Sequence, residues 1–105
     1  MRNITEVIEK QISIFKFSPR DINGGLCSEF ALSVIREMGG EKGNLKYLSI
    51  GPFKNPLHAW VLYNGKHYDA ENVKGLTNWK GMQAIEGYRG ENINIGLDAA
   101  KQEKF

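Results

Sequence analysis

The sequence predicts an α+β domain in which two amphipathic helices pack on one face of a small antiparallel β-sheet. Two stretches, residues 4–15 and 27–38, carry apolar side chains at helical spacing. Residues 45–50 alternate as in a strand, and two further strand-like runs are joined by Asn64-Gly65. These three observations define the fold class, and each element follows from its own local pattern.

The first helix is expected to begin after Asn3, which can cap it with Glu6 as the capping-box partner three residues on. Pro19 pushes Ser18 out of the helical region and so ends this helix. Residues 18–25 are then expected to form a polar loop. The apolar stripe of the helix consists of Ile4, Val7, Ile8, Ile12 and Phe15.

The second helix is expected over residues 27–38, with Gly39-Gly40 as its C-terminal stop. Cys27 follows the glycine-rich turn Gly24-Gly25 and opens this helix. It lies four residues before Ala31, so its thiol falls on the inward stripe. At a helix start, free backbone N–H groups and the helix dipole favour a thiolate. The apolar stripe consists of Phe30, Ala31, Val34, Ile35 and Met38.

Residues 57–71 predict a β-hairpin, because Asn-Gly between two strand-like runs is the strongest short-range marker of a two-residue turn. In that register His58 lies opposite Glu71 and diagonal to Asp69, on one face of the hairpin. Both carboxylates are therefore within reach of the imidazole. The same face carries Trp60, Leu62 and His67, and the other face carries Ala59, Val61, Tyr68 and Ala70.

The segment after residue 72 gives weaker signals. A short helix capped by Thr77 or Asn78 is expected to carry Trp79, followed by a short strand at 93–95. From residue 98 onward the chain is polar and expected to fray.

Length and composition exclude several classes of function. The 105 residues suit a single domain, residues 1–105, and the net charge of +2 comes from scattered groups with no basic stripe. We therefore expect no nucleic-acid and no membrane partner.

The N-terminal segment has acidic residues where a signal peptide needs an apolar run, and no stretch approaches a membrane span of about 20 residues. A cytoplasmic location is therefore expected. One Cys with two His is a poor zinc set, so no metal and no cofactor are expected. The sequence carries no signal for the oligomeric state.

Cys27, His58 and Asp69 supply a thiol, an imidazole and a carboxylate in this order, which are the components of an activated cysteine nucleophile. The bland alternative is that Cys27 is a small buried hydrophobe, His58 a strand histidine and Asp69 a surface acid. Trp60 is expected to line the site and shield it from water, and His67, beside the turn, to be structural or exposed.

The segments around these residues resemble the papain-like cysteine hydrolase superfamily, particularly its transglutaminase-like members. There a Cys opens a helix packed on an antiparallel sheet, a His begins a strand and an Asp lies on the next strand. Here His58 follows Cys27 by 31 positions and Asp69 follows by a further 11, similar to the compact transglutaminase-like arrangement. The resemblance covers about residues 22–72, in the segments 25–31, 58–61 and 65–70.

The resemblance implies a papain-like or transglutaminase-like core and a role for each residue. Cys27 would attack an acyl carbon, His58 would act as general base and then acid, and Asp69 would orient His58, with Glu71 as the alternative orienter. Papain-type enzymes place an oxyanion-stabilising Gln shortly before the cysteine. Here Asn23 is the amide in that loop and so the oxyanion candidate, with the backbone N–H of Cys27 as an alternative.

The expected function is therefore thioester formation followed by attack of water or an amine, in a protease, amidase, deamidase or transglutaminase type of enzyme. The partner would be a peptide, a protein side-chain amide or a small amide substrate. The alternative is a non-catalytic binding or assembly module on the same scaffold, because so short a chain has few loops and lacks the Gln. A third interpretation is an acyl-CoA-dependent acetyltransferase, since residues 24–27 resemble the nucleophile loop of arylamine N-acetyltransferases, which are much longer chains.

Overall fold

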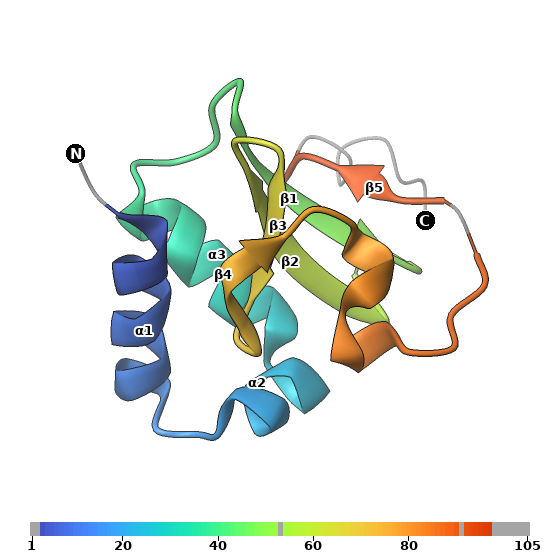
Figure 1. Cartoon of the computed structure of the whole chain (residues 1–105), viewed down its shortest axis with the longest axis horizontal. Helices are drawn as coiled ribbons and strands as arrows, with labels where there is room; N and C mark the ends of the chain where they lie inside the picture. Colours follow the sequence, from blue (N-terminus) through green and yellow to red (C-terminus); the bar gives the residue numbers. More distant parts are fainter. Residues whose placement is uncertain (1–2, 53, 91, 98–105) are drawn as a thin grey trace.

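The computed structural model describes residues 3–52, 54–90 and 92–97. Within them, three helices pack against a five-stranded antiparallel sheet, so the predicted α+β class is confirmed (Figure 1). The helices are α1 (Ile4–Phe15), α2 (Pro19–Gly25) and α3 (Cys27–Glu37). The strands are β1 (Leu45–Ile50), β2 (His58–Tyr63), β3 (Lys66–Asp69), β4 (Asn72–Leu76) and β5 (Asn94–Ile95), in the order β4-β3-β2-β1-β5.

Helix α1 begins where the sequence predicts. Asn3 Oδ1 accepts hydrogen bonds from the backbone N–H groups of Thr5 and Glu6, at 2.9 and 3.3 Å. These bonds satisfy donors that a helix start leaves without intrahelical partners. The helix ends at Lys16, whose left-handed φ of 61° stops it before Pro19. The capping prediction for Asn3 is therefore confirmed.

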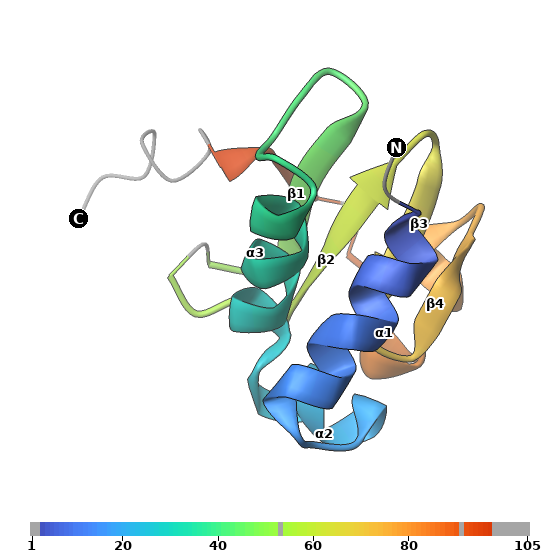
Figure 2. The same ribbon diagram turned by 90° about the vertical axis from the view of Figure 1, so that its left-hand side faces the viewer.

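The expected loop over residues 18–25 is wrong, because Pro19 starts helix α2. Ser18 caps this helix by accepting a hydrogen bond from the Asp21 N–H at 3.1 Å. Proline at the first helical position costs nothing, since its missing N–H would have no partner there. Ile22 is fully buried and anchors the short helix in the core. Two predicted helices thus become three, and α2 leads directly into α3 (Figure 2).

The predicted β2–β3 hairpin is confirmed. Asn64 and Gly65 both have positive φ, and the ladder pairs Tyr63 with Lys66 and Leu62 with His67, as the two-residue turn requires. The ladder also pairs Val61 with Tyr68 and does not extend to the predicted pairs of Trp60 with Asp69 and His58 with Glu71. Pairing between β3 and β4 shifts register between His67 and Asp69, so this end of the hairpin is irregular.

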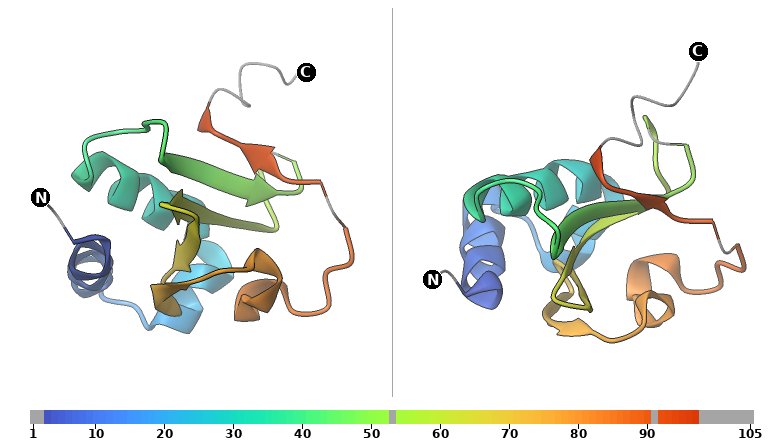
Figure 3. Two further views of the ribbon diagram at one scale, coloured as in Figure 1. Left: turned by 45° about the horizontal axis from the view of Figure 1, so that its top comes forward. Right: turned by 90° about the horizontal axis from the view of Figure 1, so that it is seen from above.

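The sheet is buried on both faces, and the helices cover one of them, as expected. The helix-side core contains Ala59, Val61, Tyr68 and Ala70, the residues predicted on the hairpin face that does not carry His58. A second core lies on the opposite face, under two 3₁₀ turns, η1 (Trp79–Gly81) and η2 (Gln83–Ile85) (Figure 3). Its buried members are Leu48, Ile50, Trp60, Met82 and Ile85.

The 3₁₀ turns replace the single short helix expected in this region. Asn78, not Thr77, caps the first turn by accepting a hydrogen bond from the Lys80 N–H at 3.0 Å. Trp79 stacks on Trp60 with ring centroids 6.0 Å apart, which fixes the segment to the sheet. The expected strand at 93–95 is present as β5, whereas the residues from 98 onward lie outside the described part of the chain.

The topology brings three chain positions to one end of the sheet. His58 is the first residue of β2 and Asp69 the last of β3, so both lie at the end of the hairpin opposite its turn. Cys27 is the first residue of α3, the helix that packs on β1 and β2. In the described residues, no helix is long and apolar enough to cross a membrane.

Candidate active site

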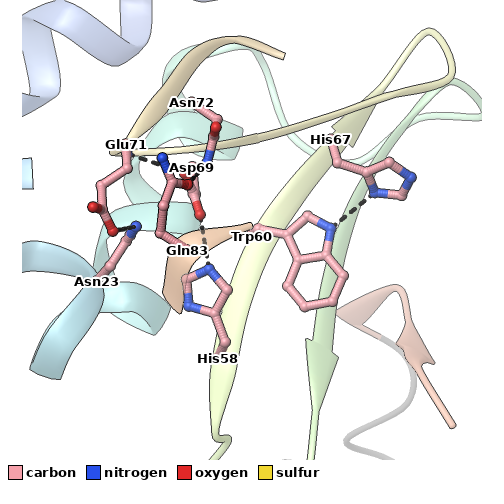
Figure 4. A network of polar contacts seen from close by, with 8 residues as sticks. All are labelled: Asn23, His58, Trp60, His67, Asp69, Glu71, Asn72 and Gln83. Atoms are coloured by element: carbon pink, nitrogen blue, oxygen red, sulfur yellow. Dashed lines mark hydrogen bonds and ion pairs between the residues drawn. The ribbon is translucent and has the colours of Figure 1, made fainter. Parts of the chain in front are cut away.

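A buried histidine–carboxylate pair forms the centre of the site. His58 Nε2 lies 3.0 Å from Asp69 Oδ2, and both side chains are buried (Figure 4). The contact joins the beginning of β2 to the end of β3 across the irregular end of the hairpin. The structure therefore places Asp69, and not Glu71, against His58. The predicted roles of these two residues in a reaction stay predictions.

The pair shifts both pKa values towards the charged forms. Burial alone lowers the pKa of His58, but the hydrogen bond to Asp69, favourable interaction with the Cys27 side chain and the Asp69 charge outweigh it, raising the pKa from 6.5 to about 9. Burial likewise opposes ionisation of Asp69, yet hydrogen bonds from His58 and Asn72 hold its pKa below the usual value. At neutral pH the pair is therefore an imidazolium and a carboxylate.

Asp69 is held in place by hydrogen bonds on its second oxygen. Oδ1 accepts from the backbone N–H of Glu71 at 3.0 Å and from Asn72 Nδ2 at 2.8 Å. Asn72 Nδ2 also donates to Gln83 Oε1 at 2.8 Å, which uses both protons of its amide. The carboxylate that meets His58 is consequently fixed in orientation by the turn between β3 and β4.

The other ring nitrogen of His58 is the one available for chemistry. Because Nε2 faces Asp69, Nδ1 is left over, and it is buried with no hydrogen-bond partner among the described residues. Cys27 is 9% exposed and interacts with His58 strongly enough to help raise its pKa. No hydrogen bond joins its thiol to the ring in the part of the chain that the structure describes. The structure thus brings two of the three predicted residues into contact, His58 and Asp69, and shows no hydrogen bond from Cys27 to this pair among the described residues.

A polar pocket of about 240 Å³ opens beside Cys27. One wall comes from the junction of α2 and α3, including Asn23 and Glu29, and the other from residues 54–57. Leu26 provides no side-chain cap for α3, and the first intrahelical bond runs from the Phe30 N–H to the Leu26 carbonyl. The N–H groups that a helix start leaves free of intrahelical partners therefore gather at the pocket.

Asn23, the predicted oxyanion donor, is tied to Glu71. Its Nδ2 donates to Glu71 Oε1 at 2.9 Å, and its buried Oδ1 has no partner among the described residues (Figure 4). The carboxylate considered as an alternative orienter of His58 thus contacts Asn23 instead. Asn23 nevertheless lines the pocket of Cys27, as its predicted role requires.

Trp60 backs His58 on the side of the second core. The two rings stack with centroids 5.6 Å apart and planes 22° apart. Trp60 is almost completely buried, and its Nε1 donates to His67 Nδ1 at 3.0 Å. Trp60 therefore restricts both the position of the imidazole and the access of water to it, while His67 serves as its hydrogen-bond acceptor.

Sequence reasoning missed Asn72 and Gln83. A signal existed for the turn itself, since an Asp followed two residues later by a free N–H can form an Asx turn. The Asp69 side chain makes such a bond to the Glu71 N–H. No local pattern indicates that Asn72 would then bridge to Gln83.

Comparison with known proteins gives no match to any protein-family model, curated protein or solved structure. Among the residues that the structure describes, no group of three His, Cys, Asp or Glu side chains could hold a metal ion. The interpretation of the site therefore depends on its own geometry.

Proposed function

We propose that this protein is a cysteine-nucleophile hydrolase or acyl transferase in which Cys27, His58 and Asp69 act together through a thioester intermediate. One observation carries the proposal: His58 is held by Asp69 through Nε2, while its buried Nδ1 is unpartnered and its pKa is raised in part by Cys27. The resemblance to papain-like and transglutaminase-like enzymes gives the same assignment of roles.

The chemistry follows from the charges of the site. His58 with a pKa of about 9 holds a proton at neutral pH, and in the active form its Nδ1 carries the proton released by the Cys27 thiol. The thiolate sulfur attacks the acyl carbon, and the carbonyl electron pair moves to the oxygen. When the tetrahedral intermediate collapses, Nδ1 gives its proton to the leaving amine and a thioester remains on Cys27. Water or a second amine then attacks the thioester carbon and loses a proton to Nδ1. The second tetrahedral intermediate collapses with cleavage of the C–S bond, which releases the acid or the new amide and regenerates the Cys27 thiolate.

The surroundings of Cys27 support attack of its thiolate on the carbonyl carbon of a small amide group. The pocket beside the thiol measures about 240 Å³ and is walled mainly by polar residues. The free N–H groups at the start of α3 are donors for a developing oxyanion. We therefore propose a peptide, a protein side-chain amide or a small amide as substrate, and the cytoplasm, where a single thiol stays reduced, as the setting.

Alkylation of Cys27 by iodoacetamide as a function of pH tests the proposal. We expect rapid reaction near pH 6, because an imidazolium beside the sulfur stabilises the thiolate, and a rate at least about tenfold lower in His58→Ala. His67→Ala is the matched control, since it removes the other histidine of the hairpin and is expected to leave the rate unchanged.

A contrary profile would identify a structural cysteine. The wild-type rate would then be low near pH 6 and rise only above about pH 8, with no dependence on His58. The wild-type profile alone decides the matter if His58→Ala does not fold. Such a result would leave the non-catalytic binding module as the better account of the scaffold.

A further inference from the structure

The turn between β3 and β4 contacts both sides of the proposed site through a single residue. The backbone N–H of Glu71 donates to Asp69 Oδ1 at 3.0 Å, while its side-chain Oε1 accepts from Asn23 Nδ2 at 2.9 Å (Figure 4). The backbone of Glu71 therefore helps to hold Asp69, the partner of the proposed base. The side chain of Glu71 holds Asn23, which lies four positions before the proposed nucleophile. A substitution of the side chain separates the two contacts.

Glu71 determines which way the Asn23 amide faces. A carboxylate only accepts hydrogen bonds, so the nitrogen of the amide must face Glu71 and the oxygen must face away. That oxygen is buried and has no partner in the described part of the chain, so no hydrogen bond to it helps to orient the amide. Asn23 is 6% exposed, and Glu71 is the one hydrogen-bond partner of its amide group among the described residues.

The same amide lies between two hollows of the surface. Asn23 and Gly24 line the pocket of Cys27 and also a second hollow of about 230 Å³, which Glu71 and Gln83 line from the other side. An amide nitrogen carries two protons, and Glu71 takes one of them. The second proton has no acceptor in the described part of the chain.

We propose that Glu71 is a positioning residue for an oxyanion donor: it holds the Asn23 amide so that the remaining Nδ2–H, together with the Cys27 backbone N–H, donates to the carbonyl oxygen of the substrate. This inference rests on the proposed function. The oxygen gains its negative charge when the Cys27 sulfur bonds to the acyl carbon, and loses it when the leaving group departs with the bonding pair. Asn23 is then the catalytic donor, and Glu71 acts through it.

Two reagents separate this role from a general effect on the thiol. Iodoacetamide alkylates a thiolate by displacement of iodide without an oxyanion, whereas p-nitrophenyl acetate acetylates it through a tetrahedral oxyanion and releases p-nitrophenolate. We expect Glu71→Ala to lower the acetylation rate of Cys27 by about tenfold or more and to leave its alkylation within about twofold of wild type. Cys27→Ser provides the blank for reaction at other groups.

Three further variants define the path of the effect. Glu71→Gln keeps an acceptor oxygen for Asn23 and is expected to restore acetylation. Asn23→Ala is expected to show the same selective loss, and the double variant Glu71→Ala, Asn23→Ala is expected to lose no more than Asn23→Ala alone. Glu86→Ala removes a carboxylate from an exposed position and is the matched control, with both rates unchanged.

The outcomes distinguish the two proposals. Equal changes in acetylation and alkylation, or no change in either, would overturn the role of Glu71, and so would additive losses in the double variant. Slow wild-type alkylation that ignores His58 would instead overturn the proposed function itself. If Glu71→Ala does not fold, Asn23→Ala, which removes the donor and leaves Glu71 in place, gives the same test of selective loss.

Discussion

The two histidines of the hairpin, His58 and His67, lie at its opposite ends, and both contact Trp60. Their environments nevertheless shift their pKa values in opposite directions. Burial lowers the pKa of His67, which accepts a hydrogen bond from Trp60 Nε1. Burial also acts to lower the pKa of His58, but Asp69 and Cys27 reverse the shift and raise it to about 9. A neutral histidine thus supports the second core, whereas a charged one lies at the start of β2. The difference shows that hydrogen-bonding and charged neighbours, not burial, determine the charge of His58.

The largest expected effect comes from removing that carboxylate. Asp69→Ala leaves a buried imidazolium without its partner, so we expect the free energy of unfolding to fall by about 3–5 kcal/mol. His67→Ala leaves only the Trp60 N–H without an acceptor and is expected to cost about 1–2 kcal/mol. Urea unfolding of both variants measures the difference. Equal losses would mean that the two histidines do not differ as described.

The pH dependence of stability separates the two histidines by sign. The folded pKa of His58 lies above its unfolded value of about 6.5, so its contribution of about 3 kcal/mol is present below pH 6.5 and is lost as the pH rises to about 9. The folded pKa of His67 is lowered, so stability falls as the pH drops below about 6.5. The depressed pKa of Asp69 adds a loss of stability only at more acidic pH.

Variants assign each limb of that curve. His58→Gln is expected to abolish the loss of stability between about pH 6.5 and 9, and His67→Gln the loss that begins below about pH 6.5. Urea unfolding across the pH range measures both effects. An alkaline limb that persists unchanged in His58→Gln would contradict the assignment of the raised pKa to this residue.

A smaller effect is expected at Asn72, which holds the carboxylate from behind. Asn72→Ala removes a hydrogen bond to the charged Asp69, and we expect a loss of about 1.5–3 kcal/mol together with a lower pKa of His58 in an NMR titration. Gln83→Ala removes only the contact to Asn72 at an exposed position and is expected to cost about 0.5 kcal/mol. If Asn72→Ala leaves the His58 titration unchanged, the amide does not position Asp69.

Much of the fold follows from local patterns in the sequence. The Asn3 cap and the Asn64-Gly65 turn depend on a few neighbouring residues, and both are found as predicted. The start of α2 could have been predicted in the same way, since Ser18 before Pro19 is a cap followed by a proline at the first helical position.

Other elements depend on contacts that no local pattern encodes. Strand β4 contains Gly75, whose φ is +85°, and a Cβ atom there would lie 2.8 Å from the Tyr68 ring. The sequence of this strand lacks the alternation of apolar and polar residues that marks the other strands. The 3₁₀ turns take their form from packing on Trp60 in the second core. Tertiary packing overrides weak local preference in both places.

The candidate site shows the same division. The sequence brings His58 and both carboxylates to one face of the hairpin, but the choice of Asp69 depends on a turn that holds its Oδ1. The Asn23–Glu71 contact joins positions 48 residues apart, so it could be seen only in the folded chain.

The central claim is that His58 takes the proton of Cys27, and the ultraviolet absorbance of the thiolate tests it most directly. The spectrum of Cys27→Ser is subtracted from that of the wild type, and the difference is followed across the pH range. The proposed ion pair predicts thiolate absorbance in the wild type at about pH 6 that disappears in His58→Ala and persists in His67→Ala. Absorbance that emerges only above about pH 8, in the wild type and in His58→Ala alike, would contradict the claim.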